Sequence, residues 1–196
     1  LGDYRVSTDQ PTATWKPENS KRYRMTPEQK AEIEELRRQA EVKTAEKYTQ
    51  AAQRAQSIWD RAEDCVKHEY LEHKQVLSYG LKKDTHDNLV IPMKDGQGTI
   101  VGLQFIAADG TKRFLTGSKK SGSFFLLGRE IFNSSDTLNY AEGYATAASI
   151  YADRSQPVVV AFDAFNLSPV AEVMYKYFPN HKHIFVADNA DSQTGE

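Results

Sequence analysis

The sequence predicts an α/β protein: a long helix comes first, then a small antiparallel β subdomain, and last a parallel sheet of βαβαβ order. Three observations support this prediction. Apolar residues recur every three or four positions from residue 26 to about 67, short apolar runs then alternate with glycine turns, and after residue 137 strand and helix patterns alternate. The predicted segments are a flexible arm (1–25), a long helical segment (26–80), an antiparallel basic subdomain (81–136) and a final domain truncated at its C-terminus (137–196).

Composition excludes several classes of protein. The 196 residues include 25 Lys and Arg against 27 Asp and Glu, a net charge of -2, so the chain is not basic throughout, although local basic patches are possible. Cys65 is the sole cysteine, which excludes a disulfide within the chain and a cysteine-based zinc site. No apolar run reaches the roughly 20 residues of a membrane helix, and no secretory signal opens the chain. We therefore expect no membrane partner and a reducing, cytoplasmic setting.

The helical segment has a clear start. Thr26 suits the N-cap, Pro27 suits the first helical position, and Gln29 completes a capping box with Thr26. No Gly or Pro follows until Gly80. The apolar periodicity continues to about Lys67, so we predict one helix of about 40 residues, or two in succession.

The antiparallel subdomain is predicted from short strands separated by turns. The strand candidates are residues 89–93, 99–106, 112–115 and 123–127. No acid occurs between Asp109 and Glu130, while five basic residues do: Lys112, Arg113, Lys119, Lys120 and Arg129. In a chain of net negative charge, this is a local positive patch suited to phosphate backbones.

The final domain places acids after its strands. Glu142, Asp163 and Asp188 follow three predicted strands, and Asp191 lies three residues further on. Because ligands of open parallel sheets bind beyond the carboxyl ends of the strands, we expect these acids at one edge. Gathered carboxylates repel one another unless a cation compensates, and such oxygen ligands suit Mg²⁺ in phosphoryl or nucleotidyl transfer. The acids could instead be ordinary turn formers and helix caps.

Several motifs occur in an order that resembles one family. The runs YAEGYATAAS (140–149), VVVAFDAFNL (158–167) and IFVADN (184–189) resemble the Toprim domain, most closely that of the Toprim primases of plasmids, phages and other mobile elements. Similar to the segment that precedes Toprim in these primases are HEYLEHK (68–74), LVIPMKD (89–95), LQFI (103–106) and DGTKRFL (109–115).

The resemblance implies a DNA primase core that joins ribonucleotides on a single-stranded DNA template with Mg²⁺ or Mn²⁺. Glu142 matches the Toprim glutamate, held to act in acid–base chemistry or metal binding, and Asp188 matches the first acid of the family's Asp-x-Asp motif, a metal ligand. The second acid would fall at Ala190, so either Asp191 replaces it as a ligand or the metal site is incomplete. The stretch that contacts template or nucleotide phosphates in the family is matched by Lys112, Arg113, Lys119 and Lys120.

These primases usually carry an N-terminal zinc-binding module, and a replicative helicase is a further expected partner. Because the chain starts with Leu1 and stops at Glu196, we expect it to be a fragment of a longer protein. Three alternatives remain: a Toprim nuclease or topoisomerase, a non-catalytic nucleic-acid-binding module, which Ala190 favours, and a phosphoacceptor receiver domain.

Overall fold

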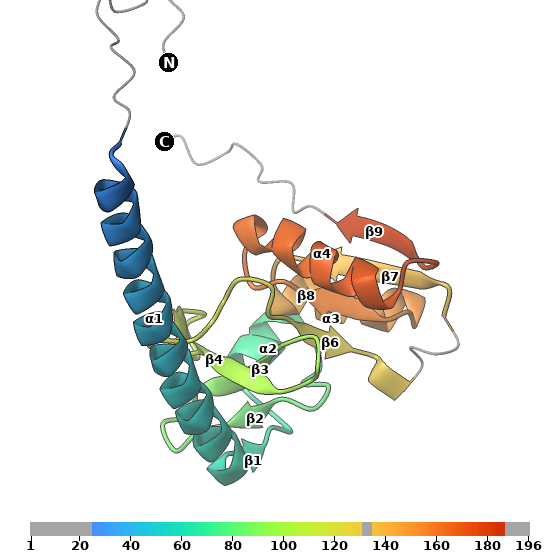
Figure 1. Ribbon diagram of the computed structural model, residues 1–196. Coiled ribbons are helices and arrows are strands. Elements are labelled where there is room, and N and C mark those ends of the chain that lie inside the picture. Colours follow the sequence, from blue (N-terminus) through green and yellow to red (C-terminus); the bar gives the residue numbers. More distant parts are fainter. Residues whose placement is uncertain (1–24, 131–134, 187–196) are drawn as a thin grey trace, which may run out of the picture. The chain divides into compact units, whose positions relative to one another are not determined.

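The computed structural model describes residues 25–130 and 135–186. The predicted class is confirmed, because a long helix precedes two β-sheets and the second sheet carries helices (Figure 1). The described elements are α1 (Pro27–Arg61), β1 (Glu63–Asp64), α2 (Glu69–Lys74), β2 (Lys82–Lys83), β3 (Leu89–Lys94), β4 (Ile100–Ile106), β5 (Lys112–Phe114), β6 (Phe125–Leu127), β7 (Thr137–Ala141), α3 (Tyr144–Arg154), β8 (Val158–Val160), the 3₁₀ turn η2 (Ala164–Asn166), α4 (Leu167–Tyr177) and β9 (Lys182–Val186).

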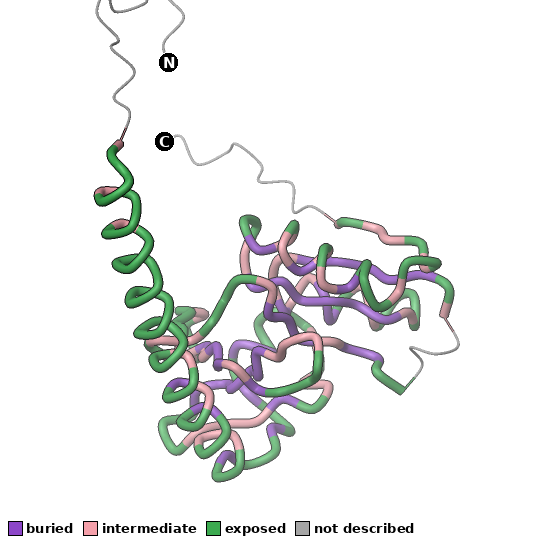
Figure 2. Tube along the Cα trace, viewed as in Figure 1, coloured by how far each residue is buried: buried purple, intermediate pink, exposed green. Residues whose placement is uncertain are grey.

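The chain forms two compact units, residues 1–41 and 42–196. In the first, the expected capping box is confirmed: the Thr26 amide donates to Gln29 Oε1 at 3.0 Å, and the Gln29 amide donates to Thr26 Oγ1 at 3.3 Å. The helical residues of this unit are mostly exposed (Figure 2). Among the described residues, no helix is both long and apolar enough to cross a membrane.

Helix α1 ends earlier than the sequence predicts. It stops at Arg61 rather than near Lys67, because the next residues leave the helix and pair as β1 with β2, Glu63 opposite Lys83. No glycine or proline marks this stop, so the local pattern does not reveal it. The division of the chain at residues 25, 80 and 136 stays a prediction.

The first sheet is antiparallel, with strand order β1-β2-β3-β4-β5. The part of α1 in the second unit covers one face of it, where Ala55 packs in a cluster with Val90 and Leu103. The Arg54 guanidinium also donates to the Thr116 carbonyl at 2.7 Å. These contacts hold the C-terminal part of α1 against the first sheet.

The second sheet has strand order β6-β8-β7-β9, with β7 parallel to both β8 and β9. Helix α3 packs on one face and α4 on the other, each over its own apolar cluster. This is the predicted parallel βαβαβ arrangement. The buried segments follow β3 and β4 of the first sheet and β6, β7 and β8 of the second (Figure 2).

Strand β6 corrects one prediction. Residues 123–127 were expected to continue the antiparallel meander, but β6 pairs antiparallel with β8 in the second sheet. Its link to the first sheet is a single bridge between Lys94 and Phe124. The edge of β8 can pair with a strand that precedes or follows it in the sequence. Only the tertiary packing decides which strand pairs there.

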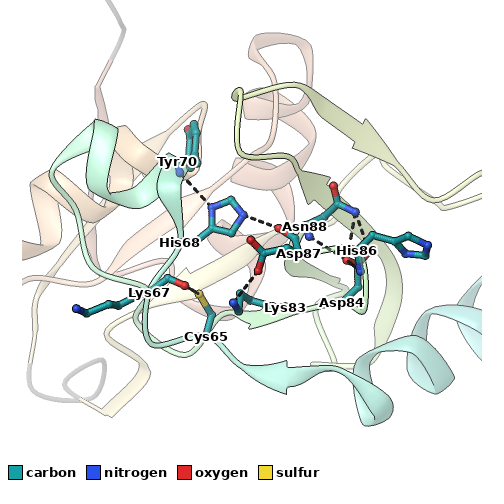
Figure 3. A network of polar contacts seen from close by, with 9 residues as sticks. All are labelled: Cys65, Lys67, His68, Tyr70, Lys83, Asp84, His86, Asp87 and Asn88. Carbon is teal, nitrogen blue, oxygen red and sulfur yellow. Dashed lines mark hydrogen bonds and ion pairs between the residues drawn. The ribbon is translucent and has the colours of Figure 1, made fainter.

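A polar network fixes the segment before β3 (Figure 3). The buried His68 ring caps α2, because its Nδ1 accepts from the Tyr70 amide at 3.1 Å. Its Nε2 lies 2.7 Å from the Asp87 carbonyl oxygen. A carbonyl can only accept, so Nε2 is the donor in this contact, while Nδ1 is the acceptor in the other. Asp87 itself forms an ion pair with Lys83 at 2.6 Å.

Candidate active site

The candidate site lies where β7 meets α3. Strand β7 ends at Ala141, Glu142 follows, and Gly143 is the N-cap of α3. Glu142 is half-buried and forms no hydrogen bond or ion pair with the other described residues. A methyl group at Gly143 would lie 3.5 Å from the Lys112 ammonium nitrogen, so this lysine from the first sheet reaches the turn that carries Glu142.

The Tyr144 side chain anchors that turn. Its buried hydroxyl lies 2.8 Å from the Leu77 carbonyl oxygen and 2.6 Å from that of Ser78. Burial raises the pKa of Tyr144, so the phenol stays protonated and keeps donating. The start of α3, and with it Glu142, is therefore held to the segment between α2 and β2.

The carboxyl end of β8 lies beside this turn. The Ala161 amide donates to the Ala141 carbonyl at 2.9 Å, which carries the β7–β8 pairing one residue further. Phe162 then adopts a left-handed conformation with φ of 72°, which costs a non-glycine residue about 1–2 kcal/mol. Asp163 follows, caps η2 by accepting from the Asn166 amide at 2.9 Å, and forms an ion pair with Lys120.

Asn166 links the loop between β5 and β6 to the end of β8. Its side-chain amide donates to the Ser123 carbonyl at 2.9 Å and to the Ala161 carbonyl at 2.7 Å, and its oxygen accepts from the Gly122 amide at 2.8 Å. Because Asn166 is 3% exposed, these bonds form away from water. The loop that carries Lys120 is thus fixed to the carboxyl end of β8.

Aromatic side chains accompany the charged residues. The Lys120 ammonium lies 5.0 Å from the centre of the Phe114 ring, and Phe114 meets Phe162 edge-on at 6.3 Å between ring centres. Phe165 is 94% exposed on η2, between two residues that are fixed by hydrogen bonds. Cations and exposed rings side by side can bind phosphates and stack bases of single-stranded nucleic acid.

The structure separates the predicted basic residues. Successive side chains of a strand point to opposite faces, so Lys112 and Phe114 face one way and Arg113 the other. Lys112 lies next to Gly143 and Lys120 pairs with Asp163, but Lys119 lines a hollow beside the turn between β3 and β4. Two of the four predicted basic residues, Lys112 and Lys120, therefore lie at the candidate site. We call this site the carboxylate edge and define it as Lys112, Phe114, Lys120, Glu142, Asp163 and Phe165.

The expected metal ligands are only partly described. Asp188 and Asp191 lie outside the described residues, and within 25–130 and 135–186 no group of three His, Cys, Asp or Glu side chains could hold a metal ion. Asp163 is engaged by Lys120 and Asn166. Glu142 has no hydrogen-bond or ion-pair partner within the described ranges, and hard oxygen donors of this kind are those Mg²⁺ takes. The one described residue that fits the expected metal is therefore Glu142.

Two features of the site escape sequence reasoning. Nothing in the sequence marks the left-handed Phe162, because bulky residues rarely adopt this conformation. Asn166 lies three residues after Asp163, a spacing typical of a helix cap, and this signal points to the 3₁₀ turn. It does not reveal that the Asn166 amide reaches a loop 44 residues earlier in the chain.

Comparison with known proteins finds DNA primases, and the resemblance expected from the sequence is confirmed. Two relatives are named DNA primase TraC, both from Escherichia coli. One is 33% identical over 187 residues, covering 91% of this chain and 17% of the relative. The other is 34% identical over 191 residues, covering 90% and 12%. The chain thus spans less than a fifth of the length of these relatives. No family model matches the chain.

Solved structures show the same fold. The primase fragment of the bacteriophage T7 primase-helicase protein superposes with a TM-score of 0.50 at 20% identity, over 67% of this chain and 59% of that one. A DnaG primase catalytic domain, solved bound to single-stranded DNA, gives a TM-score of 0.50 at 10% identity, over 71% and 61%. At these identities the likeness concerns the fold alone.

Proposed function

We propose that the chain is the catalytic core of a Toprim-type DNA primase, which synthesises RNA primers on single-stranded DNA for the replication of a plasmid, phage or integrated element. The similarity to DNA primases TraC supports the class. The observation that carries the proposal to this site is that Lys112 lies beside the Gly143 turn that follows Glu142, while Lys120 pairs with Asp163 after the neighbouring strand β8. Ribonucleotides and the template strand are the proposed substrates, in a cytoplasmic setting.

The residues divide into two roles. Lys112 and Lys120 bind phosphate oxygens, with Arg113 and Lys119 contacting the strand at positions further from the carboxylates. Glu142 acts in proton transfer or holds the metal. Phe114, whose ring lies 5.0 Å from the Lys120 ammonium, and Phe165, which is exposed two residues after Asp163, stack bases. A replicative helicase and a zinc-binding domain are proposed partners.

Mg²⁺ or Mn²⁺ is the proposed cofactor, with Glu142, Asp188 and Asp191 as its ligands. Such an ion supplies Lewis-acid stabilisation of the charge that develops on a transferred phosphoryl group. Within the protein, Lys120 orders the edge by holding Asp163, and the Gly143 turn presents Glu142 to the space beyond the strands.

The test is primer synthesis by the protein on single-stranded DNA with ribonucleotides and Mg²⁺ or Mn²⁺. We expect Glu142→Gln to lower the rate by about 100-fold or more, the usual range for losing an acid–base group. The matched control is Glu172→Gln, which removes an exposed carboxylate of α4 and should leave the rate unchanged. Activity undiminished by Glu142→Gln would refute the site assignment.

One observation favours a second candidate, a non-catalytic nucleic-acid-binding module. Ala190 stands where an acidic ligand is expected, and Asp163 is neutralised by Lys120. Titration calorimetry with Mn²⁺ separates the two: a primase core binds the ion and loses this binding in Glu142→Gln, whereas the module binds single-stranded DNA without it.

A further inference from the structure

A cavity separate from the carboxylate edge lies on the α4 side of β6. Its volume is about 360 Å³, within the range of small-ligand sites. Its walls come from the turn between β3 and β4, from β6, and from the end of α4. The lining side chains that matter are Lys94, Phe124, Leu126, Arg129, Tyr177 and Phe178.

Positive charge gathers here without matching acids. Lys94 is half-buried, and neither Lys94 nor Arg129 forms an ion pair with an acid among the described residues. Burial, and then the nearby charge of Arg129, lower the pKa of Lys94. An adjoining hollow of about 230 Å³ adds Lys119 and Lys176.

The negative groups nearby do not balance these cations. Among the described residues, Asp95 is the single carboxylate that lines the two hollows, and its Oδ1 already accepts from the Gln97 and Thr99 amides, both at 3.0 Å. The end of α4 contributes the equivalent of roughly half a negative charge. In the described part of the chain, the two hollows together therefore hold four cations against one engaged carboxylate and a helix end, and an anionic ligand would relieve the excess.

The rest of the cavity is aromatic and apolar. Tyr177 and Phe178 lie with ring centres 6.3 Å apart, Tyr177 is about half exposed, and Phe124 closes the wall. The backbone of Gly96 packs tightly on Tyr177, since a methyl group there would come within 2.7 Å of the Tyr177 ring. This contact fixes the position of the ring, and a fixed ring beside two cations suits a ligand that is both aromatic and anionic.

We propose that this cavity binds a nucleoside phosphate, with the base against Tyr177 and Phe178 and the phosphate between Lys94 and Arg129. The ligand is either a free nucleotide or one nucleotide of a single strand, since both present the same chemistry. The site shares no residue with the carboxylate edge and does not depend on the proposed primase activity.

The test is titration of the protein with a fluorescent ATP analogue in the presence of EDTA, so that a metal site at the carboxylate edge does not contribute. We expect saturable binding that weakens about tenfold or more in Lys94→Met and in Arg129→Gln, because each loses a charge-assisted contact. Lys43→Met, which removes an exposed lysine of α1, is the matched control and should bind as the wild type does.

Two further measurements locate the site. An azido-ATP label should be recovered on residues 94–98 or 174–178. Lys94→Met should also raise the melting temperature, because a half-buried charge without a partner destabilises the fold, and this shows that the variant is folded. Displacement of the analogue by ATP alone identifies a free nucleotide as ligand, and displacement also by an oligo(dT) without a terminal phosphate identifies a nucleotide of a strand.

Three outcomes would overturn the proposal: no saturable binding to the wild type, affinities of Lys94→Met and Arg129→Gln within twofold of it, or a loss of binding in Lys120→Met together with labelling confined to residues 142–145. The last result would place the nucleotide at the carboxylate edge. Each is distinguishable from failure of the primase proposal, which is decided by primer synthesis in Glu142→Gln.

Discussion

The strongest prediction concerns Asn166, whose side chain links the basic loop to the end of β8. Asn166→Ala removes three hydrogen bonds and leaves the carbonyls of Ser123 and Ala161 and the amide of Gly122 without this partner. A buried polar group left unpaired costs about 1–3 kcal/mol. Water can enter the space left by the amide, so we expect a total loss of about 3 kcal/mol, which leaves a protein of ordinary stability folded.

The loss of stability should come with a loss of binding. Once the loop is released from β8, Lys120 is no longer held at the edge, and we expect the affinity for single-stranded DNA to fall about fivefold to tenfold, or about 1 kcal/mol. Asn166→Asp should not rescue it, because a carboxylate cannot donate to the two carbonyls. Urea unfolding followed by circular dichroism measures the first effect, and fluorescence anisotropy with a labelled oligonucleotide measures the second.

A matched control separates the two effects. Asn88 is also buried, and its side-chain amide donates to Asp84 at 3.0 Å, far along the chain from the carboxylate edge. Asn88→Ala should lower the free energy of unfolding by about 1–2 kcal/mol without changing DNA affinity below the unfolding transition. The reasoning is refuted if Asn166→Ala unfolds within 0.5 kcal/mol of the wild type, or if both variants change DNA affinity equally.

Three further predictions address other residues. Tyr144→Phe should cost about 1–2 kcal/mol at pH 7. Because burial raises the pKa of Tyr144, the phenol ionises above pH 10 in the unfolded chain alone, and the free energy of unfolding then falls as the pH rises. Tyr144→Phe should lessen this fall in urea titrations between pH 9 and 11. An equal fall in wild type and variant would contradict the prediction. Phe165→Ala should leave stability within 0.5 kcal/mol but weaken DNA binding by about 1 kcal/mol or more, and Phe165→Trp should retain it in anisotropy; equal binding by all three proteins would exclude stacking. His68→Ala should lower the free energy of unfolding by about 2 kcal/mol, because the Tyr70 amide and the Asp87 carbonyl lose their shared hydrogen-bond partner. A loss no larger than that of an exposed surface variant in urea unfolding would contradict this role.

The sequence by itself determined the features that depend on near neighbours. The start of α1 follows from Thr26 and Gln29, which lie three residues apart and bond each other. The parallel strands follow from apolar runs that alternate with helices, and the position of Glu142 directly after β7 follows from that alternation. Such signals are local, so they can be recognised before any tertiary structure is known.

The tertiary structure decided the pairings between distant segments. Strand β6 joined β8 rather than the meander, Lys120 neutralised Asp163, and Arg113 was placed on the opposite face from Lys112. Asn166 became the link between the loop before β6 and the end of β8. No local pattern specifies these outcomes, because each depends on which surfaces are buried against one another when the whole chain packs.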